Sequence, residues 1–348
     1  LTSMLALFAL FWLAACTLEN GSSSNTAASA PAGSDAKPTA VTGDKTIGLS
    51  ISTLNNPFFV TLNDAAKAKA DSLQAKLTVV DAQNDASKQA ADVEDLIQQG
   101  VKLIIINPVD SAAVASAIES ANKAGIPVIT VDRSAGGGKV ISHIASDNVA
   151  GGKLAGEYML KSIAAGSDVA MLEGVAGSSA AIERGEGFTK AVEGKVKIVA
   201  SQTADFDRSK GLSVMENILQ ANPNIKAVFA QNDEMALGAL EAIAAAKKDI
   251  MVIGFDATSD AVAKVKEGKL AATVEQQPKL IGEQAIDAAV KYLSGEQVPA
   301  SIPVELKLVT KDAQYVNTLF VEQASCKITG RFFIMAIWRT THARPCCI

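Results

Sequence analysis

Polar and aromatic side chains recur where the short apolar runs of this sequence end. In open parallel sheets ligands bind just outside the carboxyl ends of the strands, so the residues at these positions are candidates for a site. Amides, carboxylates and a guanidinium can each contact two adjacent hydroxyl groups, and phenylalanine rings can cover the C–H faces of a sugar ring. These residue types favour a neutral polyol over a phosphate or an amino acid. The set consists of Asn56, Phe58, Phe59, Asn107, Asp132, Arg133, Phe206, Asn232, Asp256 and Gln276.

Each of these residues also has a purely structural interpretation. An Asn or Asp at a strand end often caps the next helix, and Asp132 or Asp256 alone fits a cap equally well. A single Phe usually belongs to the core, and Phe58-Phe59 after Pro57 could simply begin a helix. Recurrence at strand ends in both halves of the chain is what favours a cleft between two lobes.

The chain offers little material for covalent or metal chemistry. Its histidines are His143 and His342, and no cysteine lies between residues 17 and 325, so a Cys/His metal site or a disulfide framework is excluded there. Nucleotide-binding, metalloprotease and serine-hydrolase motifs are absent, and Gly136–Lys139 is predicted to be a loop. We therefore expect no enzyme activity, no cofactor and no metal, with His143 packed in a strand near the end of the first lobe.

The elements that must position the candidate residues alternate along the chain. Helical stretches are predicted at 65–74, 88–99, 112–123, 183–193 and 234–246. Runs that are apolar on both faces indicate a parallel sheet covered by helices, and there are too many for one compact open sheet. The sequence thus predicts an α/β protein with two similar doubly wound lobes, the first ending near Ser146. The strands are predicted at 47–52, 77–82, 102–107, 127–132, 168–173, 197–202, 227–232, 251–256 and 271–276.

Composition agrees with a folded protein that does not bind nucleic acid. The chain has 348 residues, of which 48% are hydrophobic and 20% charged, so a sizeable core is available. Its formal net charge is −5, whereas a nucleic-acid partner would favour a basic face.

The N-terminal part is predicted to direct and anchor the protein. Met4–Ala15 has the length of a signal-peptide apolar region, and Leu13-Ala14-Ala15-Cys16 is typical of a bacterial lipobox, in which the Cys is lipidated. A soluble secreted protein with an incidental Cys16 is the alternative. Residues 17–43 are rich in Ser, Ala, Gly, Thr and Pro and are predicted to be a flexible tether. The folded part should then lie outside the cytoplasm, lipid-anchored at the outer face of the membrane or periplasmic.

Several motifs carry a family resemblance over about residues 45–311. The chain resembles the ribose-binding proteins of bacterial ABC sugar importers, which have the type I periplasmic-binding-protein fold. The resemblance implies sugar contacts at all the strand-end residues above and adds Arg184, in the helix that begins near IERGEGF. The motifs are STLNNPFF (52–59), INP-D (106–110), PVITVDR (127–133), HIASDN (143–148), ERGEGF (183–188), ADFDR (204–208), FAQNDEMALGAL (229–240) and VIGFD (252–256).

The resemblance also implies how the chain is divided. In this family the chain crosses between the lobes three times, which makes a three-strand hinge; here the crossings should fall near 145–147, 276–277 and 303–306. Residues 313–348 have no helical or strand period and contain Cys326, Cys346 and Cys347. The expected regions are a signal peptide (1–15), a lipidated Cys with a tether (16–43), an N-terminal sugar-binding lobe (44–146 plus 277–305), a C-terminal sugar-binding lobe (147–276 plus 306–312) and an atypical, dispensable tail (313–348).

The resemblance finally implies a function without chemistry. The protein would capture D-ribose between closing lobes, as a monomer, and deliver it to the membrane permease of an ABC importer; a chemoreceptor is a further candidate partner. A related sugar, such as allose, galactose or a furanosyl signalling molecule, is the alternative ligand. A sugar-responsive transcription repressor core shares the fold, but a signal and a tether stand where its DNA-binding domain would be.

Overall fold

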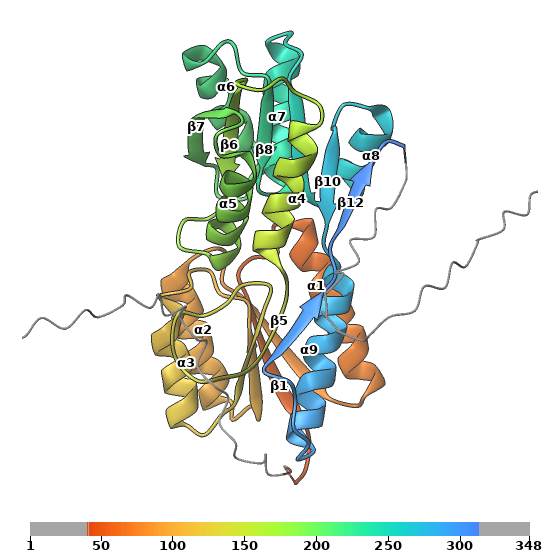
Figure 1. The fold of residues 1–348 in the computed structure, drawn as a ribbon. Coiled ribbons are helices and arrows are strands. Elements are labelled where there is room, and N and C mark those ends of the chain that lie inside the picture. Colours follow the sequence, from red (N-terminus) through yellow and green to blue (C-terminus); the bar gives the residue numbers. More distant parts are fainter. Residues whose placement is uncertain (1–39, 41, 313–348) are drawn as a thin grey trace, which may run out of the picture. The chain divides into compact units, whose positions relative to one another are not determined.

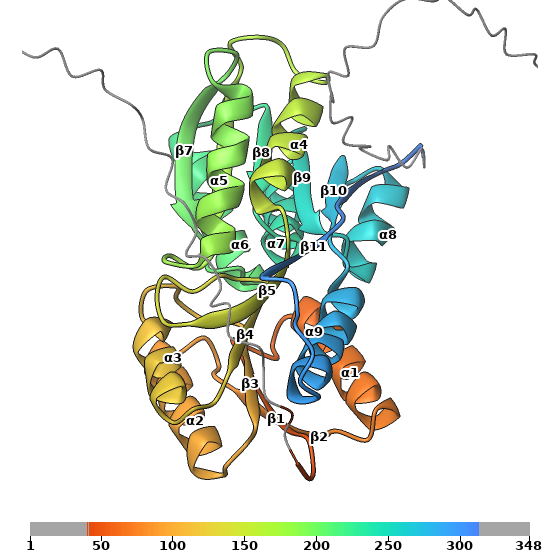
Figure 2. The same ribbon diagram turned by 60° about the horizontal axis from the view of Figure 1, so that its bottom comes forward.

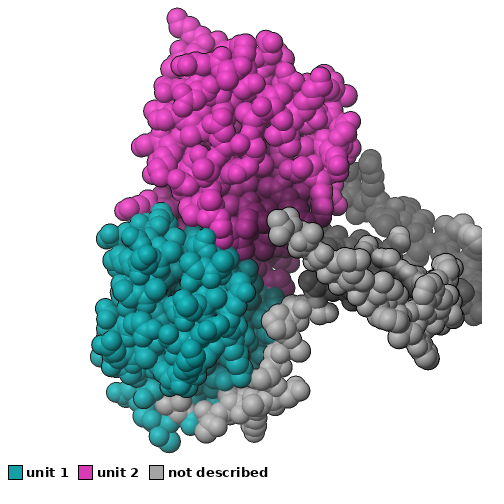
Figure 3. Space-filling model, turned by 90° about the vertical axis from the view of Figure 1, so that its left-hand side faces the viewer, with its two compact units in different colours: residues 1–54, 63–144, 282–302 teal, residues 55–62, 145–281, 303–348 magenta. Residues whose placement is uncertain are grey.

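The described part of the chain forms two compact units, coloured separately in Figure 3. The computed structural model describes residue 40 and residues 42–312. Unit 1 holds residues 40, 42–54, 63–144 and 282–302, and unit 2 holds residues 55–62, 145–281 and 303–312. The predicted signal peptide, Cys16 and tail lie outside the described residues. Within residues 42–312, no helix combines the length and apolar character needed to cross a bilayer.

The first sheet has six strands in the order β11-β5-β4-β3-β1-β2. From β5 to β2 the neighbours pair in parallel, for example Leu49 with both Val79 and Ile105. Helices α2 and α3 pack on one face, where Leu96 and Ile118 meet strand residues such as Ile104. The elements are β1 (Thr46–Ile51), α1 (Pro57–Ser72), β2 (Lys76–Asp81), α2 (Ala86–Gln98), β3 (Leu103–Ile106), α3 (Val114–Lys123), β4 (Val128–Val131), β5 (Val140–Ser146), α9 (Pro278–Leu293) and β11 (Ser301–Val304).

The second sheet repeats this order as β12-β10-β9-β8-β6-β7, with β12 antiparallel to β10 (Figures 1 and 2). Alternate residues of β6 face opposite layers, so Val169 packs with Phe188 of α5, whereas Leu172 packs with Met235 of α7. The elements are α4 (Asn148–Leu160), β6 (Asp168–Glu173), α5 (Ser179–Val192), β7 (Lys197–Thr203), α6 (Arg208–Ala221), β8 (Ala227–Ala230), α7 (Asp233–Ala245), β9 (Met251–Asp256), α8 (Ser259–Glu267), β10 (Ala272–Glu275) and β12 (Lys307–Thr310).

The predicted architecture of two similar doubly wound parallel sheets is confirmed. Every strand named from the sequence is present, and His143 lies in β5 as expected. Helix α1 begins at Pro57, earlier than the predicted start at residue 65, because Pro is pre-organised for the first helical position and Asn56 accepts a hydrogen bond from the Phe58 N–H. The short strands β11 (SIPV) and β12 (KLVT) were not predicted, because they lack the continuous apolar run of buried strands of equal length such as β3 (LIII).

Candidate functional site

Unit 1 brings three predicted site residues together where β3 and β4 end. The Asn107 side chain is fully buried; its Oδ1 accepts from the Ser52 N–H at 3.2 Å, and its Nδ2 donates to the Val131 carbonyl at 3.1 Å and to Asp132 Oδ2 at 3.3 Å. Arg133 Nε lies 3.7 Å from the same carboxylate oxygen. A buried amide, a carboxylate and a guanidinium thus form one connected polar group.

The backbone of this group is held in an uncommon conformation. Asp132 has a φ of 61°, in the left-handed region that few non-glycine residues adopt. Its N–H donates to the Ile144 carbonyl at 2.9 Å, and Arg133 Nη1 donates to the Pro108 carbonyl at 3.1 Å. Strained residues of this kind cluster at ligand sites, where the surrounding structure fixes them.

Gln89, which was not predicted from the sequence, supports this polar group of unit 1 through hydrogen bonds. This buried residue of α2 donates to the Asn107 carbonyl at 2.9 Å and to Ser50 Oγ at 3.2 Å, and its Oε1 accepts from the Val109 N–H at 2.8 Å. It therefore fixes the chain on both sides of Pro108, just after β3. Nothing in its local pattern separates it from an exposed helical Gln.

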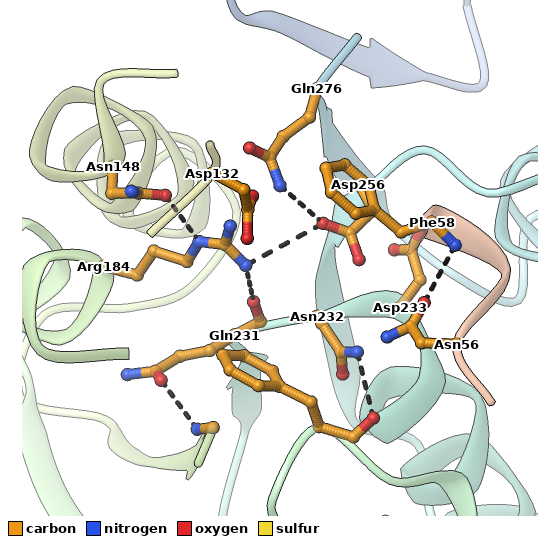
Figure 4. Close-up of polar contacts among 12 residues, drawn as sticks. Asn56, Phe58, Asp132, Asn148, Arg184, Gln231, Asn232, Asp233, Asp256 and Gln276 are labelled. Atoms are coloured by element: carbon orange, nitrogen blue, oxygen red, sulfur yellow. Dashed lines mark hydrogen bonds and ion pairs between the residues drawn. The ribbon is translucent and has the colours of Figure 1, made fainter. Parts of the chain in front are cut away.

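Unit 2 contains a buried cation, Arg184 of α5, that is almost fully enclosed. Its Nε donates to Asn148 Oδ1 at 2.9 Å and its Nη1 to the Gln231 carbonyl at 2.8 Å (Figure 4). The guanidinium carbon lies 3.9 Å from the centroid of the Phe255 ring, which gives a cation–π contact. Asn148 and Gln231 were not named as site residues, although both lie inside the motifs that carry the family resemblance.

Asp256 and Gln276 complete the polar side of this group. Arg184 Nη1 stands 3.8 Å from Asp256 Oδ1, beyond an ordinary hydrogen bond, and Gln276 Nε2 donates to the same oxygen at 2.8 Å (Figure 4). The buried Oε1 of Gln276 has no hydrogen-bond partner among the described residues. A buried acceptor without a donor is costly, so this oxygen indicates a place where a ligand can donate.

Phe206 lies in the loop between β7 and α6, where Asp205 and Phe206 have φ values of 51° and 59°. Its carbonyl accepts from Asn232 Nδ2 at 3.2 Å, and its ring centroid is 5.7 Å from the Arg184 guanidinium carbon. The ring also covers Gly174, where an added Cβ would stand 1.9 Å from the ring Cζ. Gly174 is thus a further residue that shapes the site.

The structural interpretation holds for Asn232 and Asn56, and it leaves the functional one open to them. Asn232 Oδ1 caps α7 by accepting from the Met235 N–H at 3.0 Å, and Asn56 Oδ1 accepts from the Phe58 N–H at 2.9 Å. An amide has two donors and two lone pairs, so a cap does not exhaust it. The rings of Phe58 and Phe59, both buried, meet edge to face with centroids 5.2 Å apart.

All eleven predicted site residues are thus buried, and hydrogen bonds join four pairs of them: Asn107 with Asp132, Asn56 with Phe58, Phe206 with Asn232, and Asp256 with Gln276. His143 lies apart from these bonds: its Nδ1 is 2.9 Å from Thr130 Oγ1, and burial lowers its pKa below the usual range. Among the described residues, no group of three or more His, Cys, Asp or Glu side chains could hold a metal ion.

Comparison with known proteins agrees with this arrangement. A family model described as "Periplasmic binding protein domain" matches residues 47–297. The ribose import binding protein RbsB of Bacillus subtilis is 52% identical over 309 residues, which cover 89% of this chain and 98% of that protein. The RbsB of Escherichia coli K12 is 56% identical over 76% of this chain and 90% of that protein. The crystal structure of a Caulobacter myo-inositol binding protein with myo-inositol superposes with a TM-score of 0.75 at 36% identity, covering 79% of this chain and 96% of that one. Two doubly wound sheets with buried polar groups at their strand ends, together with these matches, show that the chain belongs to the periplasmic binding protein family.

Proposed function

We propose that this protein is the solute-binding component of an ABC sugar importer and that its ligand is D-ribose. It binds the sugar without altering it and presents it to the membrane permease. Relatives that are 52–57% identical are named ribose import binding proteins, whereas the relative named as a D-allose-binding protein is 34% identical. The identity therefore favours ribose over allose.

The observation that carries the proposal is the unpartnered Oε1 of Gln276, next to the Asp256 carboxylate and the Arg184 guanidinium. A ligand that satisfies this set must both donate and accept hydrogen bonds, which a hydroxyl group does and a carboxylate or a fully ionised phosphate does not. The opposite charges of Arg184 and Asp256 balance, so a neutral ligand leaves no charge uncompensated. A neutral polyol fits these requirements.

Aromatic rings supply the second half of the recognition. We propose that Phe58, Phe59 and Phe206 cover the C–H faces of the sugar and exclude water from its hydroxyl groups. In such a site, a sugar that lacks a matched hydroxyl is rejected because the protein's own buried polar groups then lose a partner.

Closure around the sugar is the proposed transport signal. The lobes would comprise residues 44–146 plus 277–305 and residues 147–276 plus 306–312, joined by a three-strand hinge. We propose that the sugar takes contacts from both lobes at once, Asn107, Asp132 and Arg133 in the first and Arg184, Phe206, Asn232, Asp256 and Gln276 in the second. Ribose then shifts the population toward the closed form that the permease accepts.

The proposed location is outside the cytoplasm, which the family and the relatives named as importer proteins support. We further propose that Cys16 carries lipid, that the protein acts as a monomer and that a chemoreceptor is a candidate second partner. Metabolic labelling with a radioactive fatty acid tests the anchor. Label should be incorporated by the parent and not by Cys16→Ser, and label that persists in the variant contradicts it.

Calorimetric titration of the full chain with D-ribose, D-allose, D-galactose and myo-inositol tests the ligand. Ribose should bind most tightly, and Gln276→Leu should weaken it by about tenfold or more, because both a ligand contact and the support of Asp256 are lost. Gln202→Leu, at an exposed position of β7, is the matched control and should bind as the parent does. Tighter binding of allose or galactose would select the alternative ligand, and absence of binding to every sugar would refute the proposal.

A further inference from the structure

Asp233 is a completely buried carboxylate that lies directly behind the proposed sugar contacts of unit 2. It is the first residue of α7, next to Asn232, and no part of its surface is exposed. Its Oδ2 accepts from the Thr258 N–H at 2.7 Å and from Thr258 Oγ1 at 3.1 Å, and its Oδ1 accepts from Thr273 Oγ1 at 2.7 Å. All these partners donate, which is the arrangement that suits an ionised carboxylate.

The same hydrogen bonds hold the turn that presents Asp256. Asp256 and Ala257 have φ values of 116° and 57°, conformations that non-glycine residues rarely adopt. Thr273 Oγ1 accepts from the Ala257 N–H at 3.1 Å while it donates to Asp233, and Thr258 follows directly. Asp233 is therefore tied directly to Thr258 and, through Thr273, to Ala257.

The neighbouring strand leaves room for this carboxylate. At Gly254 of β9, an added Cβ would lie 2.3 Å from Asp233 Oδ1. A side chain at residue 254 would displace the carboxylate from its donors. Figure 4 shows Asp233 below Asp256 and beside Asn232.

We propose that the ionised carboxylate of Asp233 is a positioning element for sugar binding, which fixes the 256–258 turn and so places the Asp256 carboxylate and its partner Gln276. The inference rests on the proposed function, since it assumes that Asp256 contacts the sugar. Asp233 itself makes no contact with the ligand in this proposal.

Protonation of Asp233 should disturb the turn. Burial is the main cause that raises its pKa, to about 7, with the nearby Glu234 adding to it and the hydrogen bonds from Thr273 and Thr258 opposing it. A proton on Oδ2 would face the Thr258 N–H, and a proton on Oδ1 would make the Thr273 hydroxyl give up its donation to Asp233. Sugar affinity should then fall as the pH falls through the pKa of Asp233.

Other charged groups around Asp233 are already paired. Glu234, on the same helix, binds Arg208 of α6 at 2.8 Å, and Arg208 also binds Asp260 of α8 at 3.1 Å. Asp256 of β9 faces Arg184 of α5. Glu234→Gln removes the negative charge that raises the pKa of Asp233, so this variant should shift the pH dependence to lower pH without loss of affinity at pH 8.5.

The experiment is calorimetric titration of the full chain with D-ribose between pH 5.5 and 8.5, in buffers of different ionisation enthalpy that report proton release. The parent should release protons on binding near pH 7 and bind more weakly at low pH. Asp233→Asn should bind about tenfold or more weakly at pH 8.5, because a neutral amide loses the charge-assisted hydrogen bonds from Thr258 and Thr273, and it should show no proton release. His143→Gln, which removes the histidine of unit 1, should leave the proton release unchanged.

A pair of variants covers the case in which Asp233→Asn does not fold. Thr273→Val keeps the shape but removes the hydroxyl that joins Asp233 to Ala257 and should weaken ribose binding, whereas Thr273→Ser should restore it. The inference is overturned if the parent binds ribose with no proton release, or if Asp233→Asn or Thr273→Val binds as the parent does. A parent that binds no ribose at pH 8.5 would instead refute the proposed function.

Discussion

Substitution of Gly174 by Ala tests whether the position of the Phe206 ring over Gly174 is required for sugar binding. An added Cβ would lie 1.9, 2.2 and 2.3 Å from three ring carbons, whereas carbon atoms in contact are about 3.5–4.0 Å apart. The ring must therefore move by roughly 1.5 Å or more. Because the Phe206 backbone has a φ of 59° and its carbonyl binds Asn232, the loop cannot easily follow.

The expected cost follows from overpacking. Such a clash destabilises a protein by about 1–3 kcal/mol. Ribose binding should weaken by about tenfold or more, since the ring that is proposed to cover the sugar and that lies near Arg184 is displaced. Denaturant unfolding and calorimetric titration measure the two effects. Gly137→Ala, in the loop before β5, is the control, because there the added Cβ would meet one atom, the Ala115 Cβ at 3.0 Å, so a much smaller shift relieves the contact.

A double-mutant cycle with Phe206→Ala identifies the cause. If the clash with the ring is responsible, Gly174→Ala should cost much less stability in the Phe206→Ala background, and the coupling should be about 1–3 kcal/mol. An equal cost in both backgrounds would refute the argument, because it would place the strain in the backbone of Gly174 rather than in the ring.

Three further predictions concern the two buried arginines, the C-terminal segment and the pH dependence of stability. Arg133→Ala and Arg184→Ala should each weaken ribose binding by roughly ten- to hundred-fold, as each removes hydrogen bonds to a charged group, whereas His143→Ala should stay within a few-fold of the parent in calorimetric titration. Deletion of residues 313–348 should change neither the melting temperature nor the ribose affinity, and a large loss of either would show that this segment contributes to the fold. The pKa of Asp233 is about 7 in the folded protein and about 3.9 in the unfolded chain. Between these pH values the folded state binds more protons than the unfolded state. This carboxyl therefore lowers the unfolding free energy as the pH rises from about 4 to 7. Asp233→Asn should therefore gain stability relative to the parent over that range in denaturant titrations, and a constant difference would contradict the assignment.

Reading the strand ends named most residues of the proposed site because parallel strands deliver their carboxyl ends to one edge of a sheet. It placed Asn107 and Asp132 at the ends of neighbouring strands, which the structure joins by a hydrogen bond. It could not reach Arg184, which lies within helix α5; only the motif resemblance supplied that residue.

The residues that support the proposed contacts could not be recognised from the sequence for a different reason. Asp233 reads as an ordinary acidic residue in the first turn of a helix, a position that favours carboxylates. Its partners Thr258 and Thr273 lie 25 and 40 residues further along the chain, and only the fold brings them to it. Gln89 likewise owes its role to a residue 18 positions away. Local pattern identifies which side chains stand at the edge of a sheet, whereas long-range contacts decide which of them are buried and held.

The supporting contacts explain how charged side chains can stay buried in a site that is proposed to bind a neutral ligand. Removing the guanidinium of Arg184 from water is costly, yet Asn148, the Gln231 carbonyl and the Phe255 ring already compensate for it within its own unit. In the same way Gln276 Nε2 donates to Asp256 within the same unit. A ligand that meets such a prearranged set loses little energy in ordering side chains, so more of its contact energy appears as affinity. The affinity should accordingly depend on residues outside the proposed sugar contacts, such as Gln89, Asn148 and Asp233, as much as on several of the proposed contacts themselves.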